Sequence, residues 1–134
     1  MKTYTIRQIS EMFGLPASAL RYYEDMGLLE NVIHTENRQR LYTDGHIARL
    51  KAILCFKRTG LPIAKMHDFF EYEKNLPDNI DSIVALVREQ EESVCLQLEK
   101  MQEDLKHIRH KVRYYTGIKK ALESGTEWPS WDES

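Results

Sequence analysis

Apolar residues near the start of the chain recur every three or four positions, which is the spacing of one face of an α-helix. The first such run predicts a short amphipathic helix over about residues 6–13, with apolar positions at Ile6, Ile9, Met12 and Phe13. Thr5 and Gln8 stand three residues apart, so each side chain can cap the other's backbone N–H. Gly14 suits the helix end because glycine enters the left-handed conformation without steric cost.

A second helix is predicted directly after this turn. Pro16 suits its first turn, Leu20, Tyr23 and Met26 share one side, and Gly27 is the expected stop. Two helices joined by a tight glycine-containing turn are typical of a helix-turn-helix, whose second helix enters the DNA major groove. A structural helical hairpin that binds nothing is the alternative at this point.

The segment from Leu28 to Tyr42 lacks a helical period and predicts a small β-ribbon, or wing. Two β-prone pairs, Val32-Ile33 and Leu41-Tyr42, flank the polar stretch 34–40. Arg38 and Arg40 fall at the tip of this ribbon, where they are placed to contact phosphates.

Two further helices follow the wing. The first begins near Thr43-Asp44 and ends at Gly60, with apolar positions at Ile47, Leu50, Ile53 and Leu54. The second opens at Pro62 and carries Ile63, Met66, Phe69 and Phe70.

From Asp78 the pattern becomes that of a coiled coil, with apolar residues at alternating steps of four and three. Glu91 interrupts the seam at one position where an apolar residue is expected. The expected dimer seam consists of Val84, Val87, Val94, Leu98, Met101, Leu105, Ile108 and Val112. So narrow a stripe needs a partner helix, and we expect a homodimer; an intramolecular partner is the alternative.

We expect a mainly α-helical chain in three parts: a winged helix-turn-helix domain over 1–76, a coiled-coil dimerisation helix over 77–117, and a short tail over 118–134. Gly117 is expected to end or bend the long helix. Trp128 and Trp131 in the acidic tail either dock back on the body or belong to a frayed terminus.

Charge is distributed unevenly, although the formal net charge is only −2. Residues 1–67 contain 10 Lys and Arg against 6 Asp and Glu, whereas residues 68–134 contain 9 against 15. A basic N-terminal half concentrates positive potential where phosphates can bind. With no membrane-length apolar run and no signal-peptide core, we expect a cytoplasmic protein.

An enzyme is not expected. The sequence has no glycine-rich phosphate loop and no zinc-ligand spacing, and its histidines lack an evident paired nucleophile. No cofactor is predicted.

The order of elements, together with a few specific runs, resembles the MerR family of bacterial transcription regulators. The runs that carry the resemblance are Leu20-Arg21-Tyr22-Tyr23-Glu24, Gly27-Leu28-Leu29, Asn37 with Arg40-Leu41-Tyr42 and Asp44, and Gly60-Leu61 with Ile63. The motifs span about residues 4–70, and the long terminal helix agrees by architecture.

This resemblance implies a mechanism in which a homodimer binds a pseudo-palindromic promoter and distorts an overlong spacer until RNA polymerase engages both promoter elements. On the recognition helix it implies DNA contacts from Arg21 and Tyr22, while Ser18 supplies most of the hydrogen-bonding capacity of the first turn. On the wing it implies backbone contacts from Arg38 and Arg40, with Tyr42 supporting or contacting the backbone. Tyr23 is interpreted as a core residue.

The wing departs from the family pattern at two places. Arg38-Gln39 stands where a glycine and an aromatic residue often follow the wing asparagine, and His34 stands where arginine is frequent. We therefore expect a differently shaped wing tip.

The cysteines and histidines are the side chains that bear on the inducer. Cys95, His107 and His110 form no tight ligand cluster, so no metal site is predicted, and the tail is too short for a ligand domain. Cys55 is the candidate sensor because Lys51 and Arg58 can lie on its face of the helix and stabilise a thiolate.

The position of Cys55 resembles that of the single cysteine in the thiol- and aldehyde-responsive (NmlR-like) subgroup of the family. Three alternatives remain open: a cysteine that acts as a small hydrophobe, an effector-independent repressor, and a coiled-coil interaction protein.

Overall fold

A computed structural model describes residues 1–133 and separates the chain into two units, Met1–Gln90 and a second that begins at Glu91. The first unit contains a small sheet and four helices, and the long helix α5 (Leu76–Ser124) continues from the first unit into the second. No helix in the described part of the chain combines the length and the apolar character needed to cross a bilayer.

The first two helices follow the predicted cap signals closely. In front of α1 (Ile6–Phe13), Thr5 Oγ1 accepts a hydrogen bond from the Gln8 N–H at 3.1 Å, and Gln8 Oε1 accepts from the Thr5 N–H at 2.8 Å. Gly14 ends the helix with φ +65°, a conformation in which glycine is unstrained. Helix α2 (Ala17–Asp25) then begins after Pro16.

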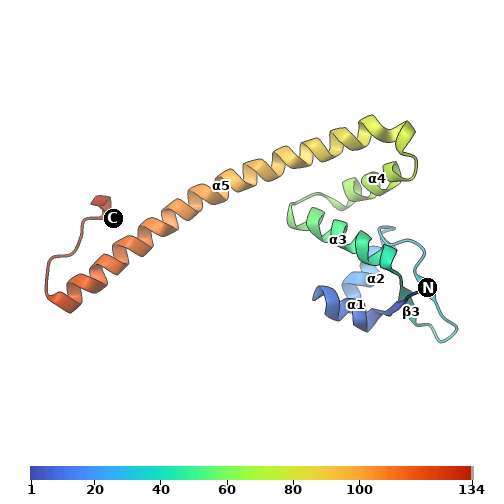
Figure 1. Cartoon of the computed structure of the whole chain (residues 1–134), viewed down its shortest axis with the longest axis horizontal. Coiled ribbons are helices and arrows are strands. Elements are labelled where there is room, and N and C mark those ends of the chain that lie inside the picture. Colours follow the sequence, from blue (N-terminus) through green and yellow to red (C-terminus); the bar gives the residue numbers. More distant parts are fainter. Residues whose placement is uncertain (134) are drawn as a thin grey trace. The chain divides into compact units, whose positions relative to one another are not determined.

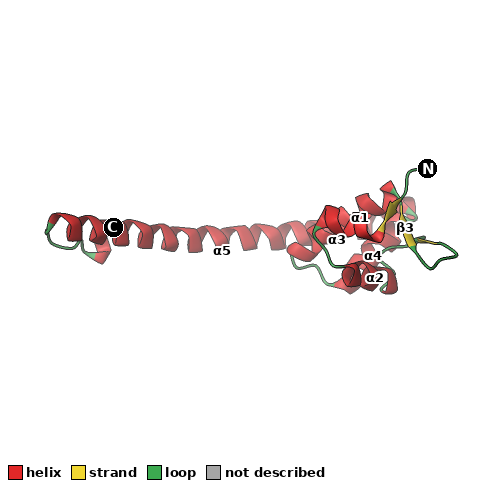
Figure 2. Ribbon diagram, turned by 90° about the horizontal axis from the view of Figure 1, so that it is seen from below, coloured by secondary structure: helices red, strands yellow, loops and turns green. Residues whose placement is uncertain are grey.

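The wing is part of a three-stranded antiparallel sheet with the order β1-β3-β2. Strands β2 (Ile33–His34) and β3 (Arg40–Tyr42) form the ribbon, whose connecting loop projects away from the helices in Figure 2. Strand β1 (Tyr4–Thr5) pairs with β3, so that Tyr4 lies opposite Tyr42. The sequence did not predict β1, because two residues are too few to show an alternating pattern.

Helices α3 (Asp44–Arg58) and α4 (Ile63–Glu73) complete the core of the first unit. Its fully buried side chains come from α1, α2, the wing, α3 and α4, and include Ile9, Leu20, Leu28, Leu29, Tyr42, Leu50, Ile53 and Met66. Because every element contributes to one core, the recognition helix and the wing are held in a fixed relationship.

Buried His46 ties the start of α3 to the loop before the wing. Its Nδ1 accepts a hydrogen bond from the Thr43 N–H at 2.9 Å, so Nδ1 carries no proton. Its Nε2 therefore donates to the carbonyl oxygen of Glu30 at 2.7 Å. His46 thus takes the place of the glutamate or glutamine usual in a capping box and also fixes the entry to the wing.

The long helix differs from the predicted boundaries at both ends. It begins at Leu76, two residues before Asp78, and continues through Gly117 to Ser124. The prediction that Gly117 ends the helix was wrong, because α5 continues for seven residues beyond it. At Gly117 an added Cβ would meet Pro129 Cγ at 2.8 Å, so a close approach of the returning chain accounts for the glycine.

Of the two tryptophans after α5, Trp131 docks on that helix, as one of the two alternatives expected, whereas Trp128 is exposed. After Gly125 the chain turns back along the helix (Figure 1), and Trp131 packs against His110 and Tyr114, with ring centroids 4.0 and 4.9 Å apart. At 100° per residue, His110 and Tyr114 lie on the face of α5 opposite Val112. The tail therefore leaves the apolar seam uncovered.

Candidate nucleic-acid interface

Helix α2 presents a polar outer face. Ser18, Arg21 and Tyr22 are exposed, with Tyr22 at 48%, whereas Tyr23 is only 2% exposed and belongs to the core. The interpretation of Tyr23 as a core residue is therefore confirmed. The three exposed side chains are those predicted to reach DNA from this helix, and they lie together on one face of it.

Four arginines surround a cavity between the start of α1, the recognition helix and the wing. The cavity has a volume of about 420 Å³ and is lined by Thr5, Ile6, Arg7, Arg21, Arg38, Gln39 and Arg40. Several arginines around one cavity suit a phosphate, because a guanidinium can donate charge-assisted hydrogen bonds to its oxygens. Two of the four are also ion-paired within the protein, Arg7 with Glu11 and Arg40 with Glu24. Arg7 was not predicted to belong to this site, because it reaches the cavity from the first turn of another helix.

Arg38 occupies an unusual backbone conformation at the tip of the wing. Its φ is +61°, and its N–H donates to the carbonyl oxygen of Thr35 at 3.0 Å to close the turn. A left-handed residue other than glycine costs roughly 1–2 kcal/mol. The arginine thus stands where the family pattern often has glycine, and the tip is held in a conformation that presents its exposed side chain.

Glu24 connects the recognition helix to both strands of the wing. Its carboxylate accepts hydrogen bonds from Arg40 Nε at 3.3 Å and from His34 Nε2 at 3.0 Å. The side chains of Glu24 and Arg40 are 17% and 25% exposed, so this ion pair is partly shielded from solvent. Arg40 therefore both lines the arginine cavity and positions the wing on α2.

Tyr42 differs from the other residues expected at the interface because it is fully buried. Tyr42 was expected either to support the wing or to contact the DNA backbone. A fully buried side chain can only support the wing, so the prediction of a DNA contact from Tyr42 is corrected. Burial raises the pKa of its phenol, and the nearby Glu24 carboxylate acts in the same direction, while Arg40 and Arg21 lower it. Its hydroxyl is buried and finds no hydrogen-bond partner among the described residues.

A second cavity adjoins the other side of the recognition helix. It has a volume of about 560 Å³ and is lined by Ser18, Ala19, Tyr22 and Tyr23 of α2 and, around the α3–α4 junction, by Lys57, Gly60, Leu61, Pro62, Ile63 and Met66. Lys57 brings a further exposed cation to this edge. Sequence patterns did not single it out, because nothing along the chain shows that the end of α3 reaches α2.

Comparison with known proteins decides the family. The model of the MerR HTH family regulatory protein matches residues 4–73, which contain the two helices, the wing and the arginine cavity described above. The chain belongs to the MerR family.

Individual relatives agree with this assignment. An HTH-type transcriptional regulator of Haemophilus influenzae is 30% identical over 117 residues, which cover 87% of each chain. The solved structure of HiNmlR, a MerR family regulator lacking the sensor domain and bound to promoter DNA, is 29% identical with a TM-score of 0.81. It covers 93% of this chain and 92% of its own.

A solved MerR family regulator from Bacillus thuringiensis is 30% identical and covers 84% of this chain and 98% of its own, with a TM-score of 0.72. The protein is thus a MerR-type transcription regulator, and its likeness to HiNmlR supports the NmlR-like subgroup.

The candidate sensor of this MerR family member lies on the surface. Cys55 is exposed on α3, as are the flanking cations Lys51 and Arg58. The second cysteine, Cys95, is also exposed. Within the described residues, no group of three or more His, Cys, Asp or Glu side chains is arranged to hold a metal ion.

The predicted dimer seam of the MerR family member faces solvent in the single chain. The seam was expected to contain two valines before Glu91 and six apolar residues after it. Seven of these eight side chains are exposed, and Val94 is half-buried. Exposed apolar side chains that recur at this spacing are typical of a surface at which another protein binds.

Proposed function

We propose that this protein binds a pseudo-palindromic promoter as a homodimer and activates transcription by distorting the spacer for RNA polymerase in the bacterial cytoplasm. The arginine cavity carries the proposal, because it brings one arginine of the recognition helix and two of the wing around a space of phosphate-binding character. Helix α2 then enters the major groove through Ser18, Arg21 and Tyr22, while Arg38 and Arg40 hold the backbone.

Positioning supports this assignment as much as charge does. The Glu24–Arg40 ion pair keeps the wing at a set distance from α2, so both elements can meet the same duplex. The promoter DNA bound by HiNmlR is the kind of ligand that this arrangement suits.

Salt-dependent DNA binding tests the proposal. Arg21→Gln should weaken binding to the promoter upstream of the protein's own gene and reduce the slope of log K against log salt by about one, since one phosphate contact is lost. Lys106→Gln removes an exposed cation from α5 and is the matched control. An unchanged affinity for Arg21→Gln would favour the alternative of a coiled-coil interaction protein.

Electrophile sensing through Cys55 is the finer part of the proposal. The thiol is exposed on α3, where an electrophile in solution can reach it, and Lys51 and Arg58 are exposed on the same helix. Run-off transcription should rise when the reduced protein is treated with a reactive aldehyde, and Cys55→Ala should abolish that rise.

Cys95→Ala is the control for the sensor, because it removes the other exposed thiol. A response that survives Cys55→Ala would eliminate the sensor role. Promoter binding without activation under either condition would favour an effector-independent repressor.

A further inference from the structure

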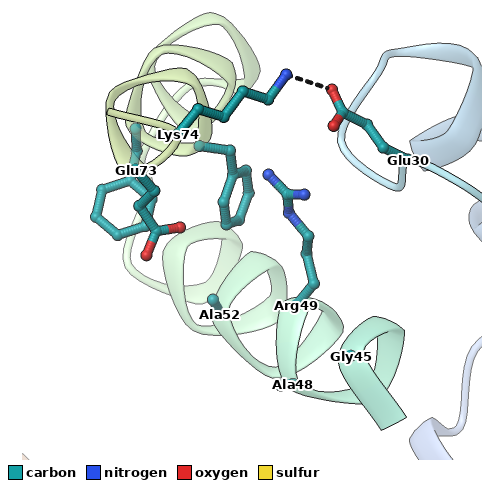
Figure 3. Close-up of a pocket in the computed structure, with 9 residues that line it drawn as sticks. Glu30, Gly45, Ala48, Arg49, Ala52, Glu73 and Lys74 are labelled. Carbon is teal, nitrogen blue, oxygen red and sulfur yellow. Dashed lines mark hydrogen bonds and ion pairs between the residues drawn. The ribbon is translucent and has the colours of Figure 1, made fainter. Parts of the chain in front are cut away.

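A cavity of about 480 Å³ lies between α3, α4 and the loop before the wing, apart from the residues assigned to DNA binding (Figure 3). We infer that this cavity binds a small organic carboxylate with a planar, apolar body. Its volume falls within the range of about 300–1,000 Å³ typical of small-molecule sites. The lining combines an aromatic wall, a wall of small residues and a cation without an acceptor.

Arg49 supplies that cation. Its guanidinium lies 3.9 Å from the ring centroid of Phe70, and this cation–π contact fixes its orientation. Its Nε is buried and has no hydrogen-bond partner among the described residues, although Arg49 is near enough to Glu71 to help lower the pKa of that carboxyl. In Figure 3 the guanidinium points toward the gap between Lys74 and Glu30. A carboxylate at this end would receive two parallel N–H donors.

Lys74 is the other cation around the cavity, and unlike Arg49 it is hydrogen-bonded to carboxylates. Lys74 Nζ donates to Glu30 at 2.9 Å and to Glu71 at 2.8 Å, and the bond to Glu71 is the main reason that its pKa is raised. Lys74 is therefore already compensated. Glu73 lines the opposite side, is exposed and has no ion-pair partner among the described residues, so it opposes an anion in the cavity.

The walls favour a flat ligand body. On α3, Gly45, Ala48 and Ala52 carry no side chain beyond Cβ and so leave space above the helix. On α4, the rings of Phe69 and Phe70 are tilted by 75° with centroids 5.3 Å apart. An aromatic ligand placed between these walls would contact ring surface on one side and small side chains on the other, while its carboxylate meets Arg49.

Calorimetric titration of the full chain with 2-naphthoate tests the inference. The neutral 2-naphthamide has the same ring system and is the matched ligand. We expect 2-naphthoate to bind and 2-naphthamide to bind at least about tenfold more weakly, because the amide cannot form a charge-assisted pair with Arg49. Failure of 2-naphthoate to bind at millimolar concentration, or equal binding of the two ligands, would overturn the inference.

Two variants that should change the affinity for 2-naphthoate in opposite directions locate the site. Arg49→Gln should weaken 2-naphthoate binding about tenfold or more, and Glu73→Gln should strengthen it several-fold by removing an opposing charge. Arg58→Gln removes an exposed cation of the same helix outside the cavity and should leave binding unchanged. Circular dichroism establishes that each variant is folded.

If Arg49→Gln is destabilised, Glu73→Gln still decides, since no gain in affinity there would contradict the inference. Arg21→Gln, which is designed to impair DNA binding, should bind 2-naphthoate as the wild type does. A variant that loses DNA binding but keeps 2-naphthoate binding would show that the two sites are independent.

Discussion

The Glu24 carboxylate on the recognition helix accepts a hydrogen bond from Arg40 Nε on strand β3 at a distance of 3.3 Å. This contact joins residues 16 positions apart in the chain and crosses from the helix to the wing. With His34 bound to the same carboxylate, both strands of the ribbon are attached to one residue of α2. Glu24 therefore adds a polar attachment between α2 and the wing to the apolar core that they share.

A double-mutant cycle measures how strongly Glu24 and Arg40 are coupled. Glu24→Gln and Arg40→Gln should show a coupling free energy of unfolding of about 0.5–1 kcal/mol, reduced by salt, because the pair is only partly shielded. Urea denaturation of the four proteins gives the value. The same cycle on Arg7 and Glu11, whose side chains are 87% and 70% exposed, should give a smaller coupling. Equal couplings would mean that the Glu24–Arg40 pair does not hold the wing.

Arg38 is expected to trade stability for DNA binding. Arg38→Gly should raise the free energy of unfolding by up to about 1 kcal/mol, because glycine relieves the left-handed strain at φ +61°. The same variant should lower promoter affinity and the salt slope, since a phosphate contact is lost. Arg38→Ala is the control: it should lose the DNA contact equally but gain no stability. A glycine variant no more stable than the alanine variant would rule out strain at this position.

Local signals explain why much of the fold could be predicted. Thr5, Gln8 and Gly14 determine the ends of α1 through contacts within a few residues, so their pattern is visible in the sequence. At Gly117 a local pattern predicted a helix end that is not there, because this glycine instead leaves room for Pro129 to approach the helix closely. That approach depends on where the chain returns after Gly125, which no local pattern encodes.

The candidate site was only partly predictable for a related reason. Arg21 and Arg38 stand at recognisable places in the helix-turn-helix and the wing. Arg7 and Lys57 join the interface only because α1 and the end of α3 pack beside the recognition helix. Arg49 likewise has no distinguishing sequence context, since its lack of an acceptor is a property of the packed structure.

Tyr42 should make the protein sensitive to alkaline pH. Burial raises the pKa of its phenol, so in the folded state the phenol keeps its proton to a higher pH than in the unfolded chain. The protein should therefore lose stability as pH rises from the ordinary value of about 10 through the folded pKa, and this loss is absent at lower pH. The Tyr42 hydroxyl is buried and has no hydrogen-bond partner among the described residues. Its removal in Tyr42→Phe should therefore stabilise the protein by about 1 kcal/mol near neutral pH.

Denaturation at a series of pH values tests both parts of this prediction. Above pH 10 the Tyr42→Phe variant should lose stability less steeply than the wild type. Tyr22→Phe, at an exposed position, should follow the wild-type curve. Parallel wild-type and Tyr42→Phe curves would show that the phenol of Tyr42 does not contribute to alkaline unfolding.

Substitutions at two leucines of α5 distinguish a dimer contact at the proposed seam from a general effect of surface hydrophobicity. Leu98 lies on the seam and Leu96 lies about 160° away around the helix, by 100° per residue; their side chains are 57% and 66% exposed in the single chain. Leu98→Glu should produce a monomer, because a charge in the seam has no partner when a second helix covers it.

Leu96→Glu should leave the mass of the dimer unchanged, since the same substitution falls outside the seam. Sedimentation equilibrium measures both variants directly. The Leu98→Glu monomer should also lose affinity for a palindromic site far more than for a half-site, because only the dimer contacts both halves. A wild-type chain that sediments as a monomer, or a Leu98→Glu variant that stays dimeric, would remove this seam as the dimer contact.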